Sequence, residues 1–173
     1  MTICFTTRRH YTHSGRFRNA CAEFVCLYCC NIVSAGQAQP GGHNRNHCPY
    51  CLSSRHLDLY EAGDRLSACR ARMKPIGLTL KRTPSKYATE TQGELMVIHQ
   101  CEECGKFSIN RIAADDDAEA ILTVFESSQW LDPCMHSLLV EGGIFMLGAA
   151  DAWLLQRRLF GQAAYAKELP SLN

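Results

Sequence analysis

Three C-x-x-C pairs constrain the fold of this chain more than any other feature. The pairs are Cys26/Cys29, Cys48/Cys51 and Cys101/Cys104. Two residues between the cysteines allow a tight turn to aim both thiolates at one metal ion, about 2.3 Å away. Two such turns complete a tetrahedron, and Cys69 adds a further thiol before the third pair. The sequence therefore predicts two closed metal sites built mainly from cysteine.

The first predicted site takes its ligands from the first two pairs, namely Cys26, Cys29, Cys48 and Cys51. The loop between the pairs is rich in Gly, Asn and Gln, so it can fold back without a core of its own. Because Cys30 adjoins Cys29, a Cys26/Cys30 pair is an alternative. The predicted ion is zinc, and the ligand types also allow iron.

The second predicted site combines Cys69, Cys101 and Cys104 with one histidine, for which the candidates are His56, His99 and His47. We favour His56, which follows Cys51 closely and is free to swing toward Cys69. His99 stays open, because it lies two residues before Cys101, and in a strand both side chains point to the same face. The remaining thiols are Cys4, Cys21 and Cys134, and we expect these to be buried or idle.

The odd total of eleven cysteines argues against a secreted disulfide framework. The start MTICFTTRRHYTHSG lacks the apolar stretch of a signal peptide. A reducing, cytoplasmic location is therefore expected. Residues 137–155 are the closest approach to a membrane span, but Glu141, Asp151 and the pair Gly142-Gly143 interrupt them, so no membrane partner is expected.

The expected fold class is α+β, a small zinc-stabilised domain of short β-hairpins followed by helices. The strand candidates are 76–81 and 93–100, and helices are expected over 114–128, from Asp132 to Gly142, and over 144–160. Asp115, Asp116 and Asp117 are interpreted as a helix cap rather than a metal site. The expected segments are a basic arm (1–22), a double zinc-ribbon domain (23–117) and an acidic helical segment (118–173).

The string Arg45-Asn46-His47-Cys48-Pro49 resembles the RNHCP-motif domain family of bacterial proteins. Other matching pieces, in order, are FVCLYC, GDR, MKPI, IHQCEECG and NRIAADD. The resemblance covers about residues 23–117 and implies a zinc-ribbon-like, cysteine-rich domain. The chain departs from the family at Cys30, where a glycine is expected after the cysteine turn.

Charge favours nucleic acid as the partner. Residues 1–111 carry 15 Lys or Arg against 8 Asp or Glu, whereas residues 112–173 carry 3 against 9. RNA is preferred over DNA because no recognition helix lies between the ligands, and ribosomal RNA is the suggested target. The acidic helices are expected to dock a protein neighbour. The candidate contacts are Arg8, Arg9, Arg16, Arg18, Arg45, Asn46, His47, Arg55, Lys81, Arg82, Lys86 and Arg111.

Three other interpretations stay open. Asn46 and His47 can instead hydrogen-bond the cysteine turn and orient its ligands. The whole chain can serve as a zinc-ribbon adaptor between proteins. In a zinc-scaffolded nuclease, His47 is the base and Asn46 its orienter. Binding is favoured over catalysis, because four protein ligands leave no open position on zinc.

Overall fold

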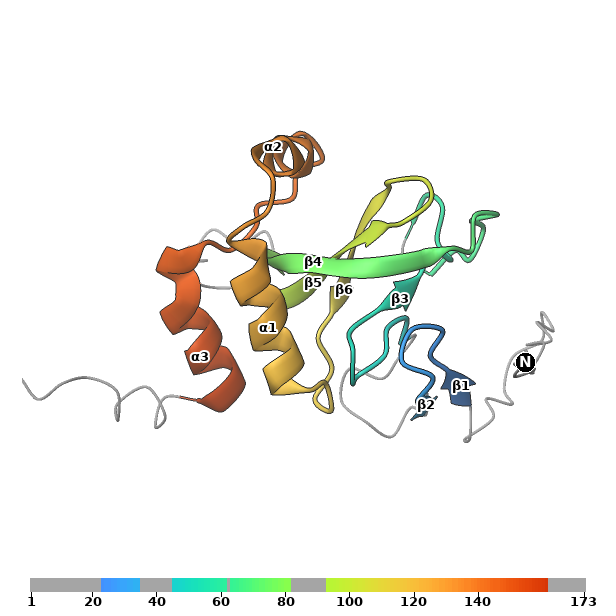
Figure 1. The fold of residues 1–173 in the computed structure, drawn as a ribbon, viewed down its shortest axis with the longest axis horizontal. Coiled ribbons are helices and arrows are strands. Elements are labelled where there is room, and N and C mark those ends of the chain that lie inside the picture. The colour runs from blue at the N-terminus through green and yellow to red at the C-terminus, as the bar shows by residue number, and fades with distance from the viewer. Residues whose placement is uncertain (1–22, 35–44, 62, 82–92, 162–173) are drawn as a thin grey trace, which may run out of the picture.

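Four strands form an antiparallel sheet in the order β3-β4-β5-β6, and a separate hairpin is formed by β1 and β2 (Figure 1). The computed structural model describes residues 23–34, 45–61, 63–81 and 93–161. Its strands are β1 (Glu23–Val25), β2 (Ile32–Ser34), β3 (Ser54–Arg55), β4 (Arg72–Lys81), β5 (Glu94–Cys101) and β6 (Phe107–Arg111). The helices are α1 (Ala118–Ser128), α2 (Pro133–Glu141), the short 3₁₀ helix η1 (Ala149–Asp151) and α3 (Ala152–Phe160). The predicted α+β class is confirmed.

Strand β4 is longer than the sequence indicates, because Pro75 lies inside it rather than before it. Proline has no N–H to donate, so it is tolerated in strands at bulges and free edges. Both conditions hold here. The register between β4 and β5 shifts between Pro75 and Gly77, and β3 pairs only with Arg72 and Met73. The expected short hairpins are therefore joined into one sheet.

The rest of the free edge of β4 is covered by residues 145–147. The Leu147 N–H donates to the Leu78 carbonyl at 2.8 Å, and the Thr79 hydroxyl donates to the Phe145 carbonyl at 2.6 Å. At Gly77 an added Cβ would lie 2.5 Å from the Met146 sulfur, so only glycine fits without a shift. Because these residues are extended, the last helix begins at Ala152 instead of the predicted residue 144.

Helix α1 packs against β4, and its predicted apolar stripe is buried at Ile121 and Phe125. It begins at Ala118 rather than at 114, because Asp117 caps it by accepting a hydrogen bond from the Glu119 N–H at 3.0 Å. The main core is formed by Leu52, Leu78, Val97, Ile121, Phe125, Leu147 and Leu155. It thus joins the sheet to α1 and α3, which stand side by side at one end of the molecule (Figure 1).

Helix α2 begins after Asp132, whose side chain accepts from the Cys134 N–H at 2.7 Å, and ends before Gly142-Gly143 as predicted. Residues 137–155 are thereby divided among α2, the extended segment, η1 and α3. Within the described residues, no helix has the length and apolar character needed to cross a membrane.

Candidate metal centres

The three C-x-x-C pairs adopt one backbone turn, repeated three times. In each turn the N–H of the residue after the second cysteine donates to the carbonyl of the first cysteine, at 2.9 to 3.1 Å. The N–H of the first cysteine in turn donates to the carbonyl five residues later, at 2.9 Å in all three. The residue after the second cysteine has a positive φ, 60° at Cys30, 56° at Leu52 and 73° at Gly105. This repeat turns both sulfurs of a pair to the same side.

Cys30 therefore adopts the left-handed conformation, at the position where the resemblance to the family predicts a glycine. Its side chain is exposed, whereas Cys29 lies in the sulfur cluster. The alternative Cys26/Cys30 pairing is thus not the one that the structure forms.

The first cluster comprises Cys26, Cys29, Cys48 and Cys51, whose sulfurs all lie within 4.8 Å of one another. The Cys26–Cys51 and Cys29–Cys48 sulfur pairs are each 3.6 Å apart. A tetrahedral ion with metal–sulfur bonds of about 2.3 Å requires sulfurs roughly 3.8 Å apart. All four cysteines are free thiols, so the cluster is positioned to bind a metal ion.

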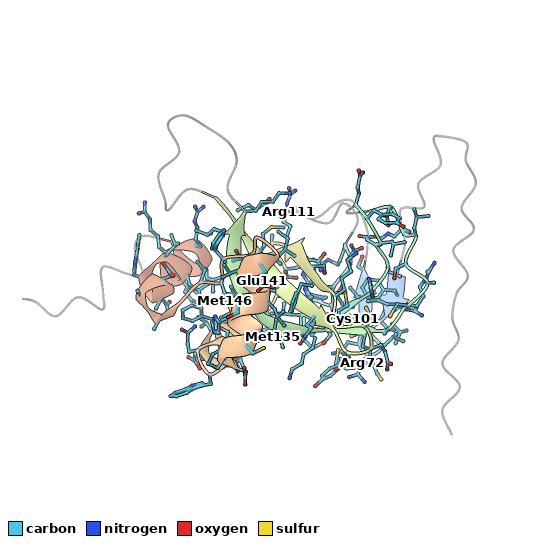
Figure 2. The ribbon with its side chains drawn as sticks, turned by 90° about the horizontal axis from the view of Figure 1, so that it is seen from above. Arg72, Cys101, Arg111, Met135, Glu141 and Met146 are labelled. Carbon is cyan, nitrogen blue, oxygen red and sulfur yellow. The ribbon has the colours of Figure 1, made fainter. Side chains whose placement is uncertain are left out.

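The second cluster brings His56, Cys69, Cys101 and Cys104 together within the same limit. The Cys69 and Cys101 sulfurs are 3.7 Å apart, and the Cys104 sulfur is 3.3 Å from Nδ1 of His56. Cys101 ends β5, and Cys104 lies in the turn toward β6. Figure 2 shows Cys101 close to Arg72 of β4, at the end of the sheet away from Met146. The structure thus unites residues from three separate stretches of chain.

Of the three histidine candidates, only His56 lies at the second cluster. Nε2 of His99 lies 2.6 Å from the Leu52 carbonyl oxygen, and its Nδ1 accepts from the Asn110 amide at 3.0 Å. Burial lowers the pKa of His99 to about 4, which keeps the ring neutral. His47 is bound elsewhere, with its Nε2 2.7 Å from Asp116.

The thiols of the first cluster differ in acidity. Burial raises the pKa of Cys48 and of Cys51. Burial acts in the same direction on Cys29, but hydrogen bonds from the Asn31 backbone and the neighbouring thiols outweigh it and lower its pKa to about 7. The cluster thus combines one readily ionised thiol, Cys29, with two that burial makes harder to ionise, so metal binding there would release protons.

Arg45 and His47 are buried, with 6% and 3% of their surface exposed. The Arg45 guanidinium binds the Asp115 carboxylate through two nitrogens, and Asp116 accepts from the Ala113 N–H at 2.8 Å while contacting His47. These contacts hold the segment before α1 against the Arg45–His47 motif. Arg45 and His47 are therefore already paired within the protein, and their direct contact with a nucleic acid stays a prediction.

The other predicted nucleic-acid residues are scattered. Arg55 and Lys81 are exposed on β3 and β4, and Asn46 is half-buried beside a pocket. Arg111 is exposed and pairs with Glu94 at 2.5 Å. Lying outside the described residues are Arg8, Arg9, Arg16, Arg18, Arg82 and Lys86, together with Cys4 and Cys21. Cys134 is an exposed thiol on α2.

One exposed group was not predicted as a unit, and we name Tyr28, Arg55, Arg70 and Arg72 the arginine–tyrosine surface. The Arg72 guanidinium lies over the Tyr28 ring, 4.5 Å from its centre. Arg55 is opposite Arg72 in the β3–β4 register, and its Nε donates to the Arg70 carbonyl at 2.9 Å. The surface joins the first cysteine turn to the sheet. No pattern in the sequence links Tyr28 to Arg72.

Comparison with protein families gives one match, the RNHCP domain, over residues 21–122. No curated protein and no solved structure matches the chain. The matched range contains all eight cluster residues and the Arg45–His47 motif. This chain therefore belongs to the RNHCP domain family.

Proposed function

We propose that this chain is a zinc-binding protein that contacts RNA, with ribosomal RNA as the leading target. Zinc is supported by the donor sets, Cys₄ in one cluster and Cys₃His in the other, which are typical of structural zinc. Four protein ligands leave no position for an activated water, so each ion would hold the fold together rather than act on a substrate.

The arginine–tyrosine surface carries the RNA part of the proposal. Arginine binds phosphate through paired N–H groups, and exposed aromatic rings stack on unpaired bases. Tyr28 is 57% exposed, and Tyr50, at the equivalent position of the second cysteine turn, is 55% exposed. Both rings stand on turns that a bound ion would make rigid. The basic excess of residues 1–111 adds attraction to a polyanion.

Native mass spectrometry and X-ray absorption test the metal. We expect two zinc ions per chain, with an average environment of seven sulfurs to one nitrogen over both sites. The Cys48→Ser variant should lose one ion, and the Cys134→Ser control should keep both. Iron in the purified protein, or two ions retained in Cys48→Ser, would contradict the assignment.

Fluorescence anisotropy with a single-stranded RNA tests the partner. Log affinity should fall with log salt by about 0.7 for each phosphate neutralised. Arg72→Gln should weaken binding roughly fivefold, as expected for a lost charged contact. The matched control is Arg157→Gln, an exposed arginine on α3 at the other end of the molecule (Figure 1), and it should leave affinity unchanged. Equal losses of RNA affinity in the two variants would contradict the proposed surface.

An adaptor between proteins is the second candidate, and the β1–β2 hairpin favours it. Val25, Leu27 and Ile32 are 40%, 46% and 65% exposed there. A partner bound through these side chains would show little salt dependence, in contrast to RNA. The nuclease alternative receives no such support, because the proposed base His47 is buried against Asp116.

A further inference from the structure

A pocket of about 230 Å³ lies beside the second cluster, between the segment that follows β3 and strand β6. His56 and Phe107 both line it. Asn46, the middle residue of the motif, also lines it. The pocket is therefore framed by a predicted metal ligand and by the motif that defines the family.

His56 presents an unused donor there. The residue is only 4% exposed, and its Nδ1 faces the Cys104 sulfur at 3.3 Å. An imidazole that binds metal through one nitrogen carries its proton on the other, which almost always finds an acceptor. Yet Nε2 of His56 is buried and has no hydrogen-bond partner within the structure described. Metal binding at Nδ1 would place the proton on Nε2, which would then be a hydrogen-bond donor without an acceptor.

Asn46 presents the complementary acceptor. Residues 45–47 are extended, with His47 bridged to Ser54, so the side chains of Arg45 and His47 share one face and Asn46 takes the other. Its amide nitrogen donates to Asp58 at 3.4 Å, whereas its Oδ1 is buried and has no partner among the described residues. His56 and Asn46 thus both line one pocket, and each holds a buried, unpaired polar atom, one a donor and the other an acceptor, although buried polar atoms are ordinarily paired.

We infer that this pocket takes one unstacked RNA base. A base edge carries an acceptor beside a donor, which matches Nε2–H of His56 and Oδ1 of Asn46. Phe107 and Tyr60 supply aromatic groups in the lining, on which a planar ligand can stack. Asp58 and Glu61 also line the pocket together with Arg55 and Lys106, so the charges of the lining balance, which suits a neutral ligand such as a base. The choice of a base as the ligand rests on the RNA contact proposed above.

The test uses the metal-loaded full chain and the four ribonucleosides, which carry no phosphate and so test the pocket apart from the phosphate contacts proposed for the arginine–tyrosine surface. In ¹H–¹⁵N spectra, at least one nucleoside should shift the amide signals of Asn46, His56 and β6. The His56→Cys variant is the decisive one, because it keeps a metal ligand while removing the donor. It should retain two ions by native mass spectrometry and bind the nucleoside about tenfold more weakly, the loss expected for one hydrogen bond.

Asn46→Leu should weaken nucleoside binding by a similar factor, and Gln156→Leu on α3 is its amide-to-leucine control. Undiminished nucleoside binding by a metal-loaded His56→Cys variant would overturn the inference. The inference would also be overturned if no nucleoside shifted any of these signals, because the pocket would then hold only water. If RNA still binds in that case, the proposed function stands without the pocket. Nucleoside shifts without RNA binding would support the pocket and overturn the RNA surface.

Discussion

The Nε2 atom of His99 lies 2.6 Å from the carbonyl oxygen of Leu52. Since Nδ1 of the same ring accepts from the Asn110 amide at 3.0 Å, Nε2 carries the proton and donates to Leu52. Leu52 is the left-handed residue of the second cysteine turn, and His99 belongs to β5. One fully buried imidazole thus joins the first metal cluster to the central sheet.

Replacing His99 by phenylalanine should lower the free energy of unfolding of the metal-loaded protein by about 2–3 kcal/mol. The reason is that the Leu52 carbonyl and the Asn110 amide would both lose their partner inside the protein. Urea denaturation measures the change. His136→Phe, on the partly exposed α2, is the control and should change stability by less than about 0.5 kcal/mol. Equal effects would show that His99 acts by bulk alone.

The same histidine predicts a dependence of stability on pH. Burial lowers the pKa of His99 from 6.5 to about 4, so between these values the unfolded chain binds a proton that the folded protein does not. Its contribution is complete above pH 6.5 and is lost as the pH falls toward 4. Over that range the wild type should lose about 3 kcal/mol more than His99→Gln. Parallel pH curves for the two proteins would contradict this role.

Two glycine substitutions at equivalent turn positions should have opposite effects. Cys30 is exposed, so Cys30→Gly should stabilise the protein by about 1 kcal/mol by removing the cost of a left-handed side-chain-bearing residue. Leu52 is fully buried in the main core, so Leu52→Gly should destabilise it by about 2–3 kcal/mol despite the same relief. Thermal unfolding with zinc in excess compares them, and two changes of the same sign would refute the argument.

The carboxylates before α1 should differ in importance. Asp116 has a fully buried side chain that contacts His47 and accepts from the Ala113 N–H. Asp116→Ala should lower the free energy of unfolding by about 3 kcal/mol, because it leaves the buried His47 without its partner. The Asp115 side chain is 32% exposed, and Asp115→Ala should cost less, about 2 kcal/mol, because Asp116 still lies 3.7 Å from the buried Arg45 guanidinium. Denaturant unfolding ranks the two, and the reverse order would show that Arg45 depends on Asp115 first.

Gly77→Ala should destabilise the protein by about 1–3 kcal/mol, because the new Cβ meets the Met146 sulfur at 2.5 Å. Met146→Ala removes that sulfur and lowers stability by itself, because it also removes packing. The double variant should therefore be more stable than the sum of the two single changes predicts. Strict additivity would mean that residues 145–147 do not pack on β4 as described.

Local sequence patterns predicted how the cysteines group into clusters. The spacing of each C-x-x-C pair lies within one turn, so the grouping of Cys26, Cys29, Cys48 and Cys51 depends on little besides that turn. His56 was favoured over two rivals on proximity in sequence. What excluded His99 and His47 was their other partners, the Leu52 carbonyl and Asp116, and neither partner is visible in a sequence pattern.

Contacts between distant residues were the ones missed. Arg45 and Asp115 are 70 positions apart, so the motif arginine looked available for phosphate although it is buried. The start of α3 at Ala152 instead of residue 144 has a similar cause, since residues 145–147 pair with the open edge of β4. That edge exists only because β3 is two residues long.

The two clusters differ in how far along the chain their ligands lie. All four thiols of the first lie between Cys26 and Cys51, in two local turns. The second needs Cys69, just before β4, and Cys101, at the end of β5, which meet only when β4 and β5 pair. A chain growing from its amino end can therefore capture its first ion well before Cys104 has been synthesised. The second ion can be captured only after the sheet has paired, so its uptake reports completion of the domain.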